Sequence, residues 1–162
     1  MFNQYRQCAG AIVFNRNGLV LLGNRIDTRT AAWQFSQGGI EADETPEQAA
    51  RRELFEEMSV VSIESVYSDN HPFRYEFPDD VKAHFRSKGI FTNGQDIYFS
   101  LFFFTGIDEE INVRTENPEF KSYRWDTLEF AKNNVVDFKK EAYLYVTNLV
   151  SPLICQYLKR LT

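Results

Sequence analysis

One segment constrains this chain more than any other, and it runs from Gly38 to Val60 as GGIEADETPEQAARRELFEEMSV. It opens with a glycine pair and an acidic loop. Thr45-Pro46-Glu47-Gln48 then predicts the start of a helix, because threonine caps well, proline suits the first helical position and glutamine completes a capping box. The pattern carries this helix to about Met58. We therefore predict a sharp turn followed by a short, well-capped helix.

Three glutamates of this helix lie on one face. Residues at i, i+3 and i+4 are neighbours on a helix, so Glu53, Glu56 and Glu57 share one arc. Like charges crowded in this way repel, and a hard divalent cation relieves the repulsion because Mg²⁺ and Mn²⁺ prefer carboxylate and carbonyl oxygens. The competing interpretation is a solvated charged face. Arg52 precedes Glu56 by four residues, so we expect the two to pair and to hold this glutamate in one rotamer.

The composition limits the class of protein. A chain of 162 residues suits one domain with a real core, and 43% hydrophobic residues exclude a disordered tail. The net charge of −5 argues against a broad electrostatic grip on nucleic acid, so any phosphate ligand is expected to depend on a metal and a few local cations. Cys8 and Cys155 lack a metal-ligand spacing and are expected to be buried free thiols. No apolar run suits a signal core or a membrane span, which favours a cytoplasmic protein.

Strands and helices are expected to alternate along the chain. Asn17-Gly18 separates two β-prone runs, Cys8–Phe14 and Leu19–Leu22, and predicts a hairpin. Further strands are expected at Trp33–Phe35, Val60–Tyr67, Ile97–Thr105 and Tyr123–Trp125, and further helices at Asp126–Asn133 and Phe138–Leu149. Residues 69–95 have poor periodicity and predict a long loop, and Pro152 is expected to end or kink the last helix. The pattern indicates a mixed α/β (α+β) domain with helices packed against a sheet.

The spacing in the central segment resembles a known motif, the Nudix box of the Nudix hydrolases. The matching positions are Gly38, Glu44, Arg52-Glu53-Leu54, Glu56-Glu57 and Val60. Residues 38–60 are thus similar to the box, and residues 1–162 to a single Nudix hydrolase domain. Ser59 departs from the family's glycine and is expected to stop the helix in a left-handed conformation at a cost of about 1 kcal/mol. The resemblance implies a Nudix-type α/β/α sandwich, with a mixed sheet between helices.

The resemblance also implies a reaction, the hydrolysis of a nucleoside diphosphate linked to another moiety. Water attacks phosphorus with the help of Mg²⁺, for which Mn²⁺ is a substitute. Such chemistry needs neutralised phosphate oxygens and an oriented water, which a metal supplies. From the family, Glu56 and Glu57 are expected to be the main ligands, Glu53 a further ligand or the base, and the carbonyl near Gly38 another oxygen ligand. Glu119, outside the box, is expected to join the metal cluster or to act as base.

Several segments outside the box resemble bacterial RNA pyrophosphohydrolases and the related asymmetrical diadenosine tetraphosphate hydrolases. They are WQFSQGG at 33–39, RYEFP at 74–78, GQ at 94–95, DEEIN at 108–112, PEF at 118–120 and VDFKK at 136–140. By this resemblance Arg6, Arg25 and Lys139 are expected to bind phosphate. Tyr75 and Phe138 are expected to stack on a base. Surface positions are the competing interpretation for the cations, and core packing is the competing interpretation for Phe138.

Two departures from these relatives bear on the substrate. Asp96 and the apolar residues after it replace basic residues that are common there. Glu76, Asp79 and Asp80 occupy a segment where RNA-processing members can carry lysines. Because acidic side chains repel a long RNA backbone, we slightly favour a small-molecule nucleoside polyphosphate of the diadenosine tetraphosphate type over the 5′ triphosphate end of RNA.

Two other classes of function stay open. Ser36, Ser59 and the altered segment after Gly94-Gln95 depart from the family pattern and suggest a catalytically weakened nucleotide-binding or regulatory module. A helix that binds metal only for structure is a further alternative. Within the leading hypothesis, the sequence leaves open the bond that is cleaved, the number of metal ions, the identity of the base and the oligomeric state.

Overall fold

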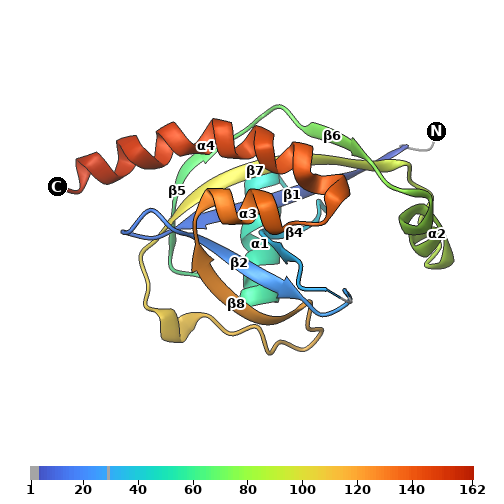
Figure 1. The fold of residues 1–162 in the computed structure, drawn as a ribbon, viewed down its shortest axis with the longest axis horizontal. Coiled ribbons are helices and arrows are strands. Elements are labelled where there is room, and N and C mark those ends of the chain that lie inside the picture. Colours follow the sequence, from blue (N-terminus) through green and yellow to red (C-terminus); the bar gives the residue numbers. More distant parts are fainter. Residues whose placement is uncertain (1–3, 29) are drawn as a thin grey trace.

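A mixed sheet forms the middle layer of the computed structural model, which describes residues 4–28 and 30–162 (Figure 1). Its strands are β1 (Tyr5–Phe14), β2 (Val20–Arg25), β3 (Trp33–Gln34), β4 (Ser36–Gly39), β5 (Ile63–Ser68), β6 (Phe73–Glu76), β7 (Gly94–Phe104) and β8 (Phe120–Asp126). The order is β3-β2-β1-β7-β5, while β4, β6 and β8 pair with β1, β7 and β2, respectively. β1 and β7 run parallel, and the other described pairs are antiparallel.

Helices cover both faces of this sheet. α1 (Pro46–Met58) lies on one face, while α3 (Leu128–Asn134) and α4 (Lys140–Arg160) lie on the other (Figure 1). α2 (Asp79–Ser87) stands at one end of the molecule. Two short 3-10 turns, η1 (Asp108–Glu110) and η2 (Asp137–Lys139), complete the described elements. The α/β/α sandwich expected from the sequence is confirmed.

Strand β1 shows why two apolar cores form. Ile12 and Phe14 belong to the cluster that contains residues of α4, whereas Ala11 and Val13 belong to the cluster that contains residues of α1. Successive strand side chains point to opposite faces, so a strand that is covered on both sides is apolar at nearly every position. β7 follows the same rule and is buried along almost its whole length. The long buried strand predicted at Ile97–Thr105 is therefore confirmed.

The first hairpin and the central helix form as predicted. Gly18 has a φ of 76° in the turn that joins β1 to antiparallel β2. At the start of α1, Thr45 accepts a hydrogen bond from the backbone N–H of Gln48, whose side chain accepts one from the N–H of Thr45. Ser59 ends the helix at a φ of 64°, and its hydroxyl donates to the carbonyl oxygen of Asn112 at 2.9 Å. That bond offsets part of the roughly 1 kcal/mol of left-handed strain.

The segment expected to be a long loop contains two elements. β6 pairs with β7 and α2 follows it, so the prediction of a loop over residues 69–95 is wrong. The backbone groups of β6 are satisfied by a strand that comes later in the chain, which local composition does not reveal. Only Val81 and Phe85 of α2 pack against the core, and both are partly buried. With so few apolar contacts, this helix leaves little hydrophobic pattern in the sequence.

Helix α4 continues through Pro152 to Arg160, so the expected end near Leu149 is wrong. Proline in a helix interior costs about 3 kcal/mol, because it removes a hydrogen bond and crowds the preceding turn. Apolar packing beyond the proline outweighs this cost. Ile154 is buried, and the ring of Tyr157 meets that of Phe14 edge-on at a centroid distance of 5.5 Å.

The two cysteines are free thiols, as expected, but their environments differ. Cys8 is buried within β1, where burial raises its pKa to about 11, whereas Cys155 is exposed on α4. The prediction of burial is therefore correct for Cys8 and wrong for Cys155. In the part of the chain that the structure describes, no helix has the length and apolar character needed to cross a bilayer.

Candidate active site

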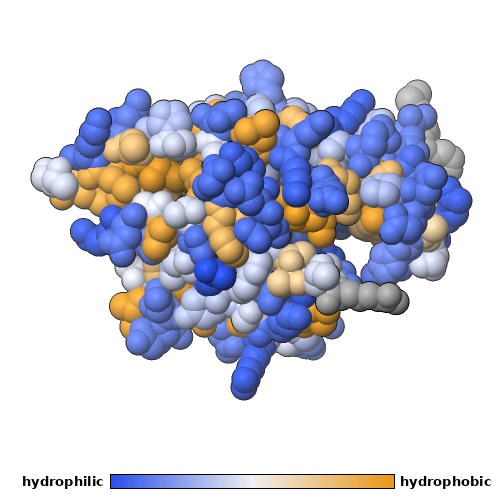
Figure 2. Space-filling view, viewed as in Figure 1, coloured by the Kyte–Doolittle hydropathy of each residue, from blue (hydrophilic) through white to orange (hydrophobic). Residues whose placement is uncertain are grey.

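A cleft of about 790 Å³ brings most of the predicted site residues together. α2 forms one of its walls, and the hollow at the right of Figure 2 separates α2 from the body of the molecule. The predicted residues that line the cleft are Arg6, Arg25, Gly38, Glu53, Glu56, Glu57, Glu119, Phe138 and Lys139. Arg52 and Tyr75 lie outside this lining. The cleft has the size of a small-molecule site, for which about 300–1,000 Å³ is usual.

Glu57 is the most deeply placed of the three helix glutamates. Its residue is 5% exposed, whereas the side chain of Glu53 is 16% exposed and that of Glu56 is 54% exposed. The hydroxyl of Ser36 donates to Glu57 Oε1 at 2.7 Å, and the backbone N–H of Gln37 donates to the same oxygen at 3.0 Å. Burial raises the pKa of Glu57 to about 8, and the negative charges of Glu53 and Glu119 add to the rise.

Gly38 permits the close approach of strand β4 to the glutamate face of α1. A Cβ placed on Gly38 would lie 2.0 Å from the carboxyl carbon of Glu53, far inside contact distance. Ala49 and Ala50, one turn before Glu53 on the helix, are fully buried. Small residues on both elements therefore let the Glu53 carboxylate lie directly against the β4 backbone.

Arg52 organises this region from outside the cleft. It donates to Glu44 Oε2 at 2.7 Å, to Glu53 Oε1 at 2.8 Å and to the carbonyl oxygen of Gly39 at 2.8 Å. The expected contact with Glu56 is present but longer, at 3.4 Å. Hydrogen bonds with Glu44 are the main reason that the pKa of Arg52 is raised. Arg52 thus fixes Glu53 and the turn after β4 more firmly than it fixes Glu56.

The donor set of the cleft suits a hard divalent cation. Within residues 4–28 and 30–162, no three acidic, histidine or cysteine side chains converge as a preformed cluster. Glu57 and Glu53 accept hydrogen bonds from Ser36 and Arg52, respectively. Burial nevertheless raises the pKa of Glu53 as well as that of Glu57, which indicates negative charge that the protein donors do not fully compensate. A cation such as Mg²⁺ or Mn²⁺ would stabilise the charged form of these buried carboxylates.

Two cations of the cleft share one buried acceptor, Gln34. Arg25 Nη1 donates to Gln34 Oε1 at 3.0 Å, and Lys139 Nζ donates to the same oxygen at 3.1 Å. Lys139 is only 3% exposed, and burial together with the positive charge of Arg25 lowers its pKa to about 7. Gln34 was not predicted as a site residue, because its only signal in the sequence is a polar residue inside the Trp33–Phe35 strand.

The two aromatic residues expected to stack on a base take different positions. Tyr75 is 6% exposed, donates its hydroxyl to Gln95 and packs against Phe138 with a centroid distance of 6.1 Å. Phe138 is partly buried and lines the cleft, where its ring meets that of Phe77 edge-on at 5.7 Å. Tyr75 therefore supports Phe138 from behind, and Phe138 alone of the pair faces the cleft.

The acidic departures mostly lie away from the cleft. Asp96 accepts hydrogen bonds from Arg74 and Gln7 and is absent from the described lining. Asp80 lines the wall formed by α2, whereas Glu76 and Asp79 do not. The replacement of a basic residue by Asp96 therefore removes no cation from the described cleft, because neighbouring strand residues point to opposite faces.

Comparison with known proteins decides the family. The model of the NUDIX domain matches residues 4–146 of the chain. The chain belongs to the NUDIX family. This Nudix chain is 37% identical over 155 residues to an RNA pyrophosphohydrolase of Erythrobacter litoralis, with 93% of each protein covered. It is 38% identical over 144 residues to an RNA pyrophosphohydrolase of Roseobacter denitrificans, with 88% of this chain and 89% of the relative covered.

The fold of this Nudix protein also recurs among solved structures. An Ap4A hydrolase of C. elegans, in a binary complex, aligns with a TM-score of 0.61 and 14% sequence identity. The alignment covers 90% of this chain and 98% of that one. At this level of identity the match supports the fold, and it agrees with the α/β/α layers described above.

Proposed function

We propose that this Nudix hydrolase cleaves a phosphoanhydride bond of a nucleoside polyphosphate with the help of Mg²⁺, for which Mn²⁺ can substitute. One observation carries the proposal: a single cleft is lined by four glutamates and, among its cations, by the three that were expected to bind phosphate. The glutamates are Glu53, Glu56, Glu57 and Glu119, and these three cations are Arg6, Arg25 and Lys139. Carboxylates that line one cleft can bind a hard metal ion, and cations in the same cleft attract phosphate. A metal-bound polyphosphate satisfies both sets at once.

The four glutamates and the carbonyl of Gly38 are the groups that we assign to the metal. When bound, the ion neutralises phosphate oxygens and lowers the pKa of a water molecule. The protein supplies the positions of these groups. Ser36 and Gln37 orient Glu57, and Arg52 orients Glu53. Glu119, in the exposed segment before β8, is the candidate for either a further ligand or the base.

The remaining cleft residues bind the rest of the substrate. Arg25 and Lys139 point at the shared oxygen of Gln34, so a phosphate oxygen can replace or join that acceptor. Arg6 lines the cleft beside Gly39. Phe138 offers a partly exposed ring on which a base can stack. These assignments place the base near η2 and the phosphates between the cations and α1.

The 5′ triphosphate end of RNA is the substrate that we propose first. Support comes from the RNA pyrophosphohydrolases described above, which are more than 35% identical to this chain over most of both proteins. The position of Asp96 also removes one reason for preferring a small dinucleotide. A dinucleoside polyphosphate is the second candidate, because Asp80 on the cleft wall and the net charge of −5 disfavour a long polyanion.

A direct comparison of substrates tests this proposal. Purified protein is incubated with 5′-triphosphorylated RNA or diadenosine tetraphosphate in Mg²⁺, in Mn²⁺ and in EDTA, and the products are resolved by mass. Cleavage that requires the metal is expected, and the absence of cleavage with both substrates at every metal concentration would refute the proposal. The same reaction in ¹⁸O water shows which phosphate receives the label and therefore which bond breaks.

Ser36, Ser59 and the altered segment after Gly94-Gln95 suggested a catalytically weakened binding module, and the contacts of the two serines argue against it. Ser36 orients Glu57 through its hydroxyl, and Ser59 closes the helix in the conformation that a glycine would adopt. Neither departure disturbs the glutamates. Calorimetry that shows nucleotide binding without any product would favour this alternative.

A further inference from the structure

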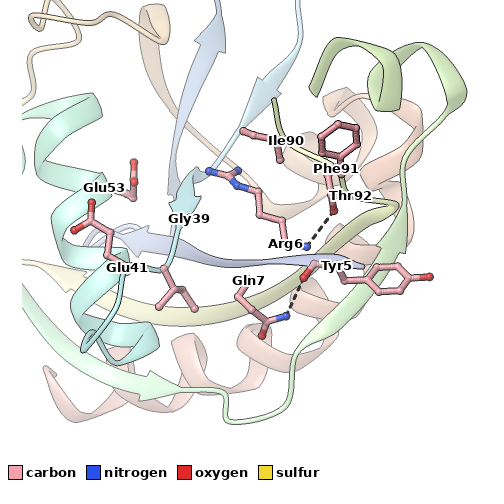
Figure 3. A pocket seen from close by; sticks show the side chains of 10 residues that line it. Tyr5, Arg6, Gln7, Gly39, Glu41, Glu53, Ile90, Phe91 and Thr92 are labelled. Carbon is pink, nitrogen blue, oxygen red and sulfur yellow. Dashed lines mark hydrogen bonds between the residues drawn. The ribbon is translucent and has the colours of Figure 1, made fainter. Parts of the chain in front are cut away.

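A side groove of about 530 Å³ leaves the cleft beside α1 (Figure 3). Arg6, Gly39, Glu53 and Ile90 line both spaces, whereas Phe138 lines only the cleft. These shared residues form the junction between groove and cleft. The groove therefore begins where Arg6 faces the glutamate helix and continues away from the aromatic residue that we assign to the base.

The lining of the groove is suited to an uncharged aromatic group. Phe91 is 64% exposed and Ile90 is 36% exposed, and together they form an apolar wall near Arg6 (Figure 3). Arg6 is the single cation among the described lining residues. Glu41, whose side chain is 67% exposed, adds negative charge. Phosphate is therefore favoured at the junction, and a neutral flat group is favoured farther into the groove.

Arg6 is free to bind a phosphate at this junction. Its guanidinium lies so close to Gly39 that a Cβ there would be 2.8 Å from Nη2. It forms no ion pair with any residue in the described ranges, and its guanidinium lies 5.9 Å from the ring centroid of Phe85. An arginine that is held in place without an acidic partner retains its full capacity for a phosphate ligand.

We propose that the side groove binds the second nucleoside of a dinucleoside polyphosphate whose first nucleoside lies against Phe138. The inference rests on the proposed function and, within it, on the second candidate substrate, and it takes the phosphates to lie between Arg6 and the glutamates. When one nucleoside of a dinucleoside polyphosphate lies against Phe138, the other end of its phosphate chain carries the second nucleoside. The far end of an RNA 5′ triphosphate is a bare phosphate, to which the Phe91 and Ile90 wall offers no donor. The base of the second nucleoside stacks on Phe91.

Phe91→Ala tests the proposal with two substrates that share a phosphate chain, diadenosine tetraphosphate and adenosine 5′-tetraphosphate. The substitution is expected to raise KM for the dinucleotide about tenfold, as the loss of one stacked base implies, and to leave KM for the mononucleotide within about twofold. Phe91→Trp keeps an aromatic face and is expected to retain the wild-type KM. Ile107→Ala is the matched control, because it shortens an apolar side chain that is 67% exposed and outside the groove.

Equal effects of Phe91→Ala on the two nucleotides, or no effect on either, would overturn the assignment. A selective loss with 5′-triphosphorylated RNA would also overturn it, because the groove would then belong to the RNA chain. Failure of the proposed function would look different, since the wild-type protein would cleave none of these substrates. Calorimetry of the two nucleotides would then still measure whether Phe91 distinguishes them.

Discussion

Replacing Gly38 by alanine displaces a single carboxylate by a known amount. The added Cβ would lie 2.0 Å from the carboxyl carbon of Glu53, and ordinary contact begins near 3.4 Å, so the carboxylate must move by about 1.4 Å. The obstacle is the end of a flexible side chain, and Gly38 does not have a positive φ, so the backbone tolerates alanine. The change therefore acts on the site while the fold is retained.

A displacement of this size is expected to be costly for catalysis. Misplacing a group by about 1 Å can reduce the rate on the order of 100-fold, so Gly38→Ala should lower kcat by about that factor. Steady-state kinetics with a nucleoside polyphosphate in saturating Mg²⁺ measure kcat, and urea unfolding measures the free energy of unfolding. Stability should change by less than about 1.5 kcal/mol, because only a partly exposed side chain moves.

A second glycine provides the control. A Cβ on Gly106 would lie 2.8 Å from Glu110 Oε1, so Gly106→Ala also displaces a glutamate, but outside the cleft. It is expected to reduce stability without a comparable loss of kcat. In a Glu53→Gln background, Gly38→Ala should have little further effect, because both changes act on the same group. Independent, additive losses in the double variant, or a kcat within twofold of wild type for Gly38→Ala, would refute the reasoning.

Three further predictions concern other parts of the chain. Glu57→Gln should reduce kcat on the order of 10³-fold or more, measured by product formation in Mg²⁺, whereas a near-normal rate would remove Glu57 from the metal site. Burial lowers the pKa of Lys139 from 10.5 to about 7, so the unfolded chain binds the extra proton between these values and stability should rise with pH from about 7 to 10. Urea unfolding should show a smaller rise in Lys139→Met, and parallel curves would contradict this explanation. Pro152→Ala should raise the free energy of unfolding by about 1–3 kcal/mol, because it restores a helix hydrogen bond; a lower urea midpoint would show that α4 depends on the proline.

Features specified by neighbouring residues could be predicted from the sequence. The cap at Thr45 and Gln48, the left-handed end at Ser59 and the turn at Gly18 each depend on a few consecutive residues. The glutamate face of α1 follows from helix geometry alone. Its meeting with Gly38 was expected only through the family resemblance, since the packing of β4 on α1 is a tertiary contact.

Features that depend on distant partners were missed. Gln34 and Lys139 meet across 105 positions of sequence, and nothing near either residue indicates that they share a buried hydrogen bond. β6 gains its backbone partners from β7, and the end of α4 is stabilised by contact with the first hairpin. Phe91, which is 64% exposed, lines the same groove as Arg6, a residue 85 positions earlier, and its local sequence pattern does not indicate this. In each case tertiary packing overrides or adds to the local signal.

The parallel pairing of β1 with β7 determines when the site can form during folding. This pairing sets Arg6 opposite Gln95, and the neighbouring bond between Gln7 and Asp96 closes a separation of 89 residues. β1 also pairs with β4, which carries Gly38 to the glutamate helix. Non-local parallel pairing is slow because chain entropy is lost before the contacts form. During refolding, α1 and the first hairpin can form early, whereas hydrolytic activity returns only when the first and seventh strands have joined.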